Sequence, residues 1–464
     1  MTRTTELGLL LGAVFGRLRI AARSAAYPQG SLISTFIMRF DYSRLSGQVL
    51  AAPAIFFFVL LGTSSAQNTT RITLDQAIEL ALAHNHSLLA TRSTILQNEA
   101  QEITANLRPN PTLGVDTQFI PFFSPQDFSG ENLDQTQQFD IGISYLFERG
   151  HKRQRRLQAA RDQTAVTRAQ VADAERTLAF NVGQQFVSVL LAESTLQFAL
   201  EDLKGFQQTV DISERQLKSG YIGEGDYLKI KLQLLQFQTD VSSARLAKVQ
   251  ALVGLRQFLG YSSITADYDV VGDLAFQPVK GNLEDLQARA LRERADFRAA
   301  ELGITAAQSQ ILLAKANAKV DVNGTYDFDH VSGENTASIF ANFELPIFNR
   351  NQGEIARTSH ALTQAQEQRL SASDTVLSDV SNAYESVRSN EEVVRLYTSG
   401  YLKQAQDSRD ISEYAYKRGA ASLLDYLDAE RSYRAVELAY RQALAAYMTA
   451  LEQLKEAEGT RSLP

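Results

Sequence analysis

The acidic residues with the most informative spacing are Asp425 and Asp428, which follow Ser422 in the chain. Residues three apart lie on one face of a helix, so the two carboxylates would point the same way and attract cations. The same residues also fit an ordinary helix start, with Ser422 as the N-cap and the aspartates near the positive end of the helix dipole. The sequence alone leaves both interpretations open.

A similar segment, Gly220–Leu228, lies in the first half of the chain and contains Asp226. Gly220 and Gly419 are expected at helix C-termini, where a positive φ is common. Residues of this segment recur 199 positions later, in the pairs Lys218/Lys417, Gly220/Gly419, Asp226/Asp425, Tyr227/Tyr426 and Leu228/Leu427. The recurrence predicts a duplicated unit of about 200 residues.

The histidines and the remaining acidic residues form no recognisable enzyme site. His84 and His86 lie two apart in a predicted helix and therefore point apart, which makes a poor metal chelate. Asp327 and Asp329 share one face of a predicted strand, where they would line that face. The sequence contains no Ser–His–Asp arrangement, P-loop or dinucleotide fingerprint. We therefore expect no enzymatic activity, no cofactor and no bound metal.

The charge distribution argues against one class of partner. The chain has 464 residues and a net charge of −7, and residues 67–464 carry 40 Lys and Arg against 51 Asp and Glu. An acidic body of this kind argues against binding to nucleic acid. The chain contains no cysteine, which excludes disulfides and thiolate metal sites.

Residues 1–66 are expected to be a secretory signal segment. Basic residues precede an apolar run over 49–62 and small residues follow it, so cleavage is expected after Ala66. The apolar run is too short to cross a bilayer as a helix. Residues 1–37 fit no part of such a signal, and we therefore expect the true start to be Met38.

Two proline-free tracts, 126–277 and 347–463, predict long helices. Proline breaks a helix interior at a cost of roughly 3 kcal/mol, so its absence permits uninterrupted helices over 151–219 and 351–418. Apolar residues at three- and four-residue spacing run along both segments, which is typical of coiled-coil packing. Helices of this length form a rod or the wall of a tube.

The segments before these helices alternate apolar and polar residues, as β-strands do. In the first half Phe139, Ile141 and Ile143 share one face, and the opposite face is polar and largely acidic. This is the pattern of a transmembrane barrel with a wet lumen, although a soluble amphipathic sheet has the same period. Four strands cannot close a barrel and lipid does not tolerate an open edge, so several chains must contribute. Three copies would give twelve strands, an even number within the known range.

We divide the chain after the signal into two structural repeats, 67–281 and 282–464. Each opens with an amphipathic helix, the first running from Leu74 to about Leu107. Each repeat also holds two strands, expected at about 112–123 and 136–148 in the first and at about 319–331 and 336–347 in the second.

The residues from Arg418 through Asp428 and on to Leu454 resemble the closing helical hairpin of the TolC family of outer-membrane efflux ducts. The resemblance covers about residues 72–457 and includes the duplication. The passage LPIFNRNQGEI at 345–355 resembles the branch of the family that serves cobalt–zinc–cadmium and copper–silver exporters.

The resemblance implies a fold that is mainly α with a transmembrane β part. Three chains would form a twelve-strand β-barrel continued by a twelve-helix periplasmic α-barrel. The implied location is the outer membrane, extending into the periplasm. The implied partners are two further copies in a homotrimer, a periplasmic adaptor (membrane fusion protein), an inner-membrane pump and outer-membrane lipid.

The resemblance also implies roles for individual residues. Asp425 and Asp428 fall at the two aspartate rings that form the channel gate and selectivity site. Asp226 and Tyr416 fall at a hydrogen-bonded pair that bridges neighbouring hairpins at the closed tip. The position of the family prototype's gate arginine is Ala421 here, so one salt bridge of the gate is missing.

The hairpin turns at Gly220, Gly419 and Ser422 are then the expected docking points of the adaptor. One further departure is the absence of the lipid-bearing cysteine that many relatives in the metal branch possess.

The implied function is passive export through a tripartite efflux system, with heavy-metal cations as the cargo. Two alternatives remain within the duct class: export of organic solutes or drugs, and type I secretion of polypeptide. An alternative of another class is a soluble periplasmic coiled-coil scaffold or adaptor.

Overall fold

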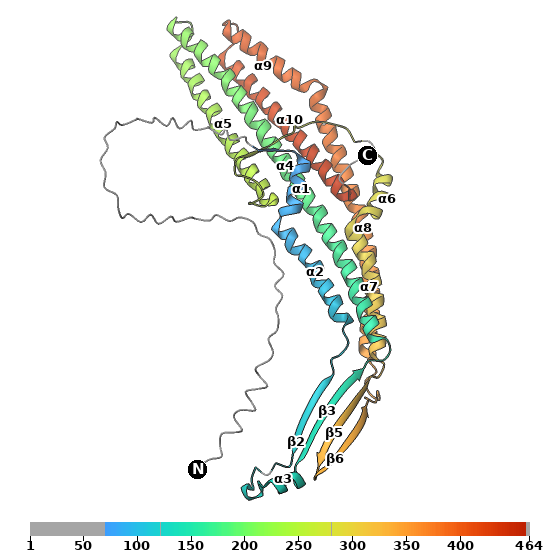
Figure 1. The fold of residues 1–464 in the computed structure, drawn as a ribbon. Helices are drawn as coiled ribbons and strands as arrows, with labels where there is room; N and C mark the ends of the chain where they lie inside the picture. The colour runs from blue at the N-terminus through green and yellow to red at the C-terminus, as the bar shows by residue number, and fades with distance from the viewer. Residues whose placement is uncertain (1–69, 121, 280, 461–464) are drawn as a thin grey trace, which may run out of the picture. The chain divides into compact units, whose positions relative to one another are not determined.

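The computed structural model groups Ala66–Pro464 into one compact unit, of which it describes residues 70–120, 122–279 and 281–460. Long helices account for most of these residues, and a four-strand sheet lies at one end of them (Figure 1). The predicted class, mainly α with a β part, is confirmed. The expected signal segment 1–66, with its start at Met38 and its cleavage after Ala66, lies outside the described residues.

The first repeat begins and ends with a short strand, and a long helical hairpin comes just before the last of these strands. In order its elements are β1 (Thr70–Ile72), α1 (Leu74–His84), α2 (His86–Asn106), β2 (Thr112–Gln118), a 3-10 turn (Pro125–Asp127), α3 (Gly130–Thr136), β3 (Gln138–Phe147), α4 (Lys152–Lys218), α5 (Glu224–Leu259) and β4 (Tyr268–Val270).

The second repeat has the same order of two helices, two strands and a helical hairpin, but the described residues include no counterparts of β1, the 3-10 turn, α3 and β4. Its elements are α6 (Leu283–Glu293), α7 (Ala295–Asn317), β5 (Val322–Val331), β6 (Glu334–Asn342), α8 (Gln352–Leu396), a π-helical turn (Tyr397–Tyr401), α9 (Leu402–Lys417) and α10 (Leu423–Glu458).

The first amphipathic helix is broken, where the sequence predicted one helix from Leu74 to Leu107. Asn85 leaves the helical region with ψ 114, and its side-chain oxygen accepts a hydrogen bond from the Leu88 amide at 3.0 Å. Asn85 therefore ends α1 and caps α2, a position that favours asparagine. In the second repeat Arg294 occupies the equivalent break, 3% exposed and paired with Asp296 at 2.6 Å.

The two long helical hairpins differ. Helix α4 runs for 67 residues without a break, which confirms the prediction for 151–219. The prediction of an uninterrupted helix over 351–418 is wrong, because Gly400 takes φ 138 and ψ −17 within the π-helical turn. Only glycine adopts such a backbone readily, and an inserted turn of this kind kinks a helix. The position 199 residues earlier is Glu201, so α4 has no equivalent break.

The main sheet has the strand order β2-β3-β5-β6 and is antiparallel throughout. Its registers place Val115 opposite Ile141 and Ile141 opposite Phe328, so one apolar face continues across three strands. The strands β2 and β6 are the two edges. Each edge has one strand partner among the described residues.

All four strands are shorter than their predicted ranges, and β2 and β6 also end well before the predicted C-terminal limit. Strand β2 ends at Gln118, where the range 112–123 was predicted, because Phe119 turns to φ 58. Strand β6 ends at Asn342, where the range 336–347 was predicted. The turn between β5 and β6 needs only Ser332 and Gly333, both at positive φ, which is the geometry of a tight hairpin.

Each repeat has its own hydrophobic core. The first core includes Ile78, Val182 and Leu255, contributed by α1, α4 and α5. The second includes Leu286, Val380 and Leu454, contributed by α6, α8 and α10. The parallel pairing of β1 with β4, which the sequence did not predict, closes the first core by joining the start of the repeat to its end.

Within the described residues, no helix combines the length and the apolar character needed to cross a membrane.

Candidate functional site

The two hairpin turns end their first helices in the same way. Gly220 and Gly419 have φ values of 73 and 71. The Tyr221 amide donates to the Gln216 carbonyl at 2.8 Å, and the Ala420 amide donates to the Ala415 carbonyl at 2.8 Å. This is the Schellman arrangement, which requires a left-handed residue after the helix. The glycines are therefore at helix C-termini, as predicted.

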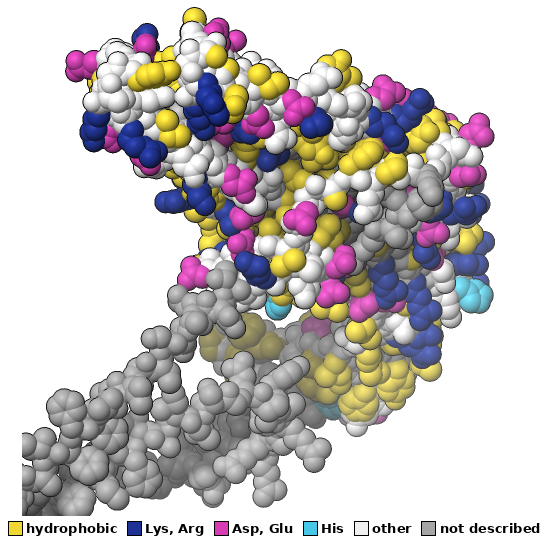
Figure 2. Space-filling view, turned by 90° about the horizontal axis from the view of Figure 1, so that it is seen from above, with side chains coloured by type: hydrophobic (Ala, Val, Ile, Leu, Met, Phe, Trp, Pro, Cys, Tyr) yellow, Lys and Arg dark blue, Asp and Glu magenta, His cyan; other side chains and the backbone are white. Residues whose placement is uncertain are grey.

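The two turns also lie against each other. A Cβ atom placed on Gly419 would lie 2.8 Å from the Tyr221 hydroxyl oxygen, so the absence of a side chain at Gly419 lets Tyr221 approach. Seen from above, the molecule carries charged side chains of both signs with hydrophobic ones between them (Figure 2). Tyr221 and Leu424, 64% and 76% exposed, are two of the hydrophobic residues beside the turns.

Ser422 and Asp425 form a capping box at the start of α10. The Asp425 amide donates to Ser422 Oγ at 3.2 Å, and the Ser422 amide donates to Asp425 Oδ2 at 3.2 Å. Asp428 lies one turn further along, 73% exposed, with Arg431 at 3.8 Å. The capping interpretation therefore holds for Ser422 and Asp425. Both carboxylates are exposed on one helix, and their placement around a pore stays a prediction.

Within one copy of the chain, the structure shows no hydrogen bond between the described residues Asp226 and Tyr416. Asp226 Oδ1 accepts from Lys229 Nζ at 3.1 Å. Tyr416 is 7% exposed, and its ring stacks on Tyr426 with centroids 5.5 Å apart. The hydroxyl of Tyr416 is buried, and a polar group that interacts with it within this chain is the buried hydroxyl of Ser213. A bond from Tyr416 to a neighbouring hairpin stays a prediction.

A hydrophobic cluster below the turns joins the two hairpins. It combines Phe206 of α4 and Phe237 of α5, stacked 4.4 Å apart, with Tyr416 and Tyr426 of the second hairpin. Any motion that separates the hairpins must expose this cluster to water, which is unfavourable.

A set of charged residues that the sequence did not predict lies behind this cluster. Arg434 of α10 donates to Asp202 of α4 at 2.6 Å and to Asp240 of α5 at 2.5 Å. The guanidinium also lies over the Phe237 ring, 4.2 Å from its centroid. Arg434 therefore ties the second hairpin to both helices of the first.

Glu430 lies one helical turn before Arg434 and is 7% exposed. Burial, together with the negative charge of Asp202, raises its pKa to about 7. Burial also raises the pKa of Asp202, against the opposing effect of Arg434. The i,i+4 spacing of Glu430 and Arg434 was visible in the sequence, but Asp202 lies 232 residues away from Arg434. No local pattern could have revealed that contact.

The second face of the sheet carries aspartates in one row. Asp116 is opposite Asp140 and Asp140 is opposite Asp329, while Asp327 is opposite Gly142. Like charges directly opposite each other destabilise a sheet. Neutral side chains solvate part of this charge: Gln118 donates to Asp116 at 2.7 Å, and Ser338 donates to Asp329 at 2.7 Å. The row makes this face strongly attractive to cations.

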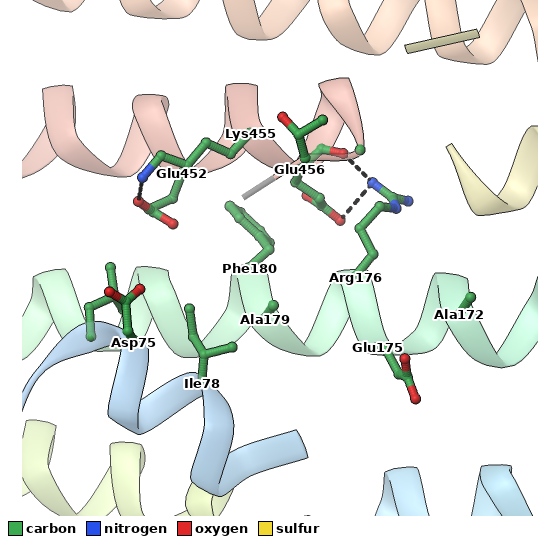
Figure 3. A pocket seen from close by; sticks show the side chains of 13 residues that line it. Asp75, Ile78, Ala172, Glu175, Arg176, Ala179, Phe180, Glu452, Lys455 and Glu456 are labelled. Atoms are coloured by element: carbon green, nitrogen blue, oxygen red, sulfur yellow. Dashed lines mark hydrogen bonds and ion pairs between the residues drawn. The ribbon is translucent and has the colours of Figure 1, made fainter. Parts of the chain in front are cut away.

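A cavity of about 250 Å³ lies between α1, α4 and α10 (Figure 3). Its cations are already paired: Lys455 Nζ lies 2.6 Å from Glu452, and Arg176 donates to the Glu456 carbonyl at 2.6 Å. The cavity is therefore a structural ion-pair site. Among the described residues, no group of three or more His, Cys, Asp or Glu is placed to hold a metal ion.

The fold is that of a known class of channel protomer. A crystal structure of CusC, described as showing the changes that accompany folding and transmembrane channel formation, matches with a TM-score of 0.69. The match covers 83% of this chain and 92% of that chain at 21% sequence identity.

The family model described as "Outer membrane efflux protein" matches residues 77–261 and 286–460, one segment in each repeat. The chain belongs to this family of outer-membrane channels. The predicted resemblance to the TolC family and the predicted location in the outer membrane are confirmed.

The names of two curated relatives mention different cargoes. The cobalt-zinc-cadmium resistance protein CzcC of Cupriavidus metallidurans is 22% identical over 380 residues, covering 80% of this chain and 85% of the relative. The pyoverdine export outer membrane protein OpmQ of Pseudomonas putida is 24% identical over 389 residues, covering 77% of this chain and 80% of the relative.

The buried carboxylate of Glu430 gives the stability of the chain a pH dependence. Its pKa rises from 4.5 to about 7 on folding, so the folded chain holds a proton that the unfolded chain releases. The free energy of unfolding therefore falls between pH 4.5 and 7, by up to about 3 kcal/mol. Glu430→Gln removes this loss, and its unfolding temperature in detergent should exceed that of the wild type increasingly as the pH rises.

Glu437→Gln is the matched control, because Glu437 is on the same helix and is paired with Arg441. It should follow the pH dependence of the wild type. A constant difference between wild type and Glu430→Gln from pH 5 to pH 8 would contradict the assignment.

Proposed function

We propose that this protein is the outer-membrane channel of a tripartite efflux system and that it exports cations passively. The sheet supports this proposal most directly: it has one apolar face and one acidic face, and its two edge strands each have one strand partner among the described residues. It continues through β3 and β6 toward the long helices α4 and α8. A strand face that suits lipid and an opposite face that suits water are what a membrane barrel requires.

The edges of the sheet support an assembly of several copies. Strands β2 and β6 lie at the two edges of the four-strand sheet, and an open edge is not tolerated in lipid. Pairing β6 of one copy with β2 of the next removes the edges. Three copies give a barrel of twelve strands, and each copy also contributes the helical hairpins α4–α5 and α8–α10 to a twelve-helix tunnel.

Helix α5 supports the same assembly. Six apolar residues on it are between 51% and 69% exposed: Leu228, Leu232, Leu235, Leu246, Val249 and Val253. With Thr239 and Ser242 they follow a strict alternation of four- and three-residue steps, which is the seam of a coiled coil. We call these residues the α5 seam. A helix of the next copy in the homotrimer is its proposed partner.

The cargo we propose is heavy-metal cations. The aspartate row formed by Asp116, Asp140 and Asp329 would give nine carboxylates at one level of a three-copy barrel. Asp425 and Asp428 would add two rings of three at the hairpin tips, a constriction that favours cations. The name of CzcC, a cobalt-zinc-cadmium resistance protein, agrees with this choice.

The hairpin tips are the proposed gate and docking site. A periplasmic adaptor would contact the turns at Gly220, Gly419 and Ser422, and an inner-membrane pump would supply the energy. Asp226 and Tyr416 would hold neighbouring hairpins closed. Residue 421 is alanine and cannot form the salt bridge that an arginine would form there. The stability of the closed state would therefore depend more on the packing of Tyr416 and Tyr426 in the hydrophobic cluster.

Export of organic solutes is the second candidate, favoured by the similarity to OpmQ over 77% of this chain. A panel of susceptibilities in a deletion strain separates the two. We expect sensitivity to zinc, cobalt, nickel, cadmium or copper that returns to normal when the wild-type chain is supplied. Sensitivity confined to dyes, detergents or antibiotics would overturn the metal cargo and leave the duct intact.

The double variant Asp425→Asn with Asp428→Asn tests the tip rings. Asparagine preserves the shape and hydrogen-bonding capacity of the side chains, so the helix start should survive while the charge is lost. The permeability ratio of K⁺ to Cl⁻ in planar bilayers should fall, and block by multivalent cations should weaken. Unchanged selectivity and unchanged block would show that the two aspartates act only at the helix start.

A further inference from the structure

A second feature of the hairpins is a cavity of about 730 Å³ between α5 and α10. Its floor includes Phe198 and Ala199 of α4, the helix that packs against both neighbours. The volume lies within the range of small-molecule sites. Apolar side chains from three helices line it: Phe198, Ala199, Ala244, Ala247, Leu427, Ala435 and Leu438. We call this cavity the α5–α10 groove.

Glu430 lines the groove and is its unpaired charge. Its side chain is 7% exposed, and it makes no hydrogen bond or ion pair with the residues that the structure describes. Burial without a partner disfavours the charged form of a carboxylate. A positive group entering the groove beside Glu430 would counter this effect.

The other charged groups around Glu430 do not neutralise it. Asp202 of α4 and Glu413 of α9 add negative charge near it. The nearby cations have other partners: Arg434 binds Asp202 and Asp240, and Arg409 lies 2.6 Å from Asp410 and over the Tyr433 ring. Arg431, which also lines the groove, is 79% exposed and is paired with Asp428.

We propose that the α5–α10 groove binds an amphipathic organic cation, with its positive group beside Glu430 and its apolar body against Phe198, Leu427 and Leu438. A metal ion is a poor fit, since the described residues contain no group of three or more metal-ligating side chains. The proposal does not depend on the cargo of the channel being a metal.

The groove remains distinct from the α5 seam. The groove residues Gln233, Gln236, Ser243 and Ala247 each follow a seam position by one residue. One residue corresponds to about 100° around a helix axis. Packing of another copy on the seam therefore leaves the groove side of α5 facing α10.

Binding must depend on the ionisation of Glu430. Burial and the charge of Asp202 raise its pKa to about 7, so the carboxylate predominates at pH 8 and the neutral acid at pH 5.5. A cation prefers the carboxylate, and its affinity should therefore increase with pH. The ionised fraction, and with it the affinity, should be about 30-fold lower at pH 5.5 than at pH 8.

The test uses the full-length protein purified in detergent and benzyltrimethylammonium, whose charge does not change with pH. Isothermal titration calorimetry should show saturable binding that weakens about 30-fold from pH 8 to pH 5.5. Glu430→Gln should weaken binding at least about tenfold at pH 8 and abolish its pH dependence. Ala247→Phe should weaken binding by filling the groove from an exposed position.

Glu437→Gln is the matched control and should bind as the wild type does, because Glu437 lies outside the groove and is paired with Arg441. Thermal unfolding and sedimentation verify that each variant is folded and assembled. No saturable binding to the wild type would overturn the proposal. So would wild-type affinity in Glu430→Gln, or equal binding of the neutral analogue neopentylbenzene. No adaptor or pump is involved, so failure here leaves the channel function untouched.

Discussion

Backbone hydrogen bonding at the two edges of the four-strand sheet limits how this chain can exist in a membrane. Strands β2 and β6 each have one strand partner in the described chain, and hydrocarbon offers no hydrogen bonds to the groups left over. In the proposed assembly, contact with further copies would satisfy these groups and enclose the acidic face. The aspartate row would then face water, where its charge would favour cations and be less costly.

In the proposed assembly, the helical hairpins would continue the channel beyond the sheet. Polar contacts join the two hairpins of one chain. Arg434 connects α10 to both α4 and α5, and the stacked Phe206 and Phe237 fill the space beneath the turns. The second hairpin also contains the kink at Gly400, while α4 has none. The repeats therefore have similar elements but differ at this point, and the kink makes the second hairpin the better suited of the two to bend in the proposed gate.

The sequence predicted those features that depend on local patterns. Proline spacing and alternation located the long helices and the strands, and glycine chemistry located the turns at Gly220 and Gly419. The kink at Gly400 was missed because a single glycine in a helical pattern is usually tolerated. The contact of Arg434 with Asp202 was missed because the chain must fold before residues 232 positions apart meet. Which side chains would face a pore depends on how several chains assemble, and local patterns in one chain do not determine it.

Closure of the sheet between copies can be tested by disulfide crosslinking, because the chain contains no cysteine of its own. Cysteine pairs placed on β2 and β6, such as Val115→Cys with each of Ala337→Cys, Ile339→Cys and Ala341→Cys, scan the possible registers. Oxidation in outer-membrane vesicles should give covalent dimers and trimers for one register. Each single variant should remain monomeric in denaturing gels. Monomers for every pair along both edges would contradict closure by neighbouring copies.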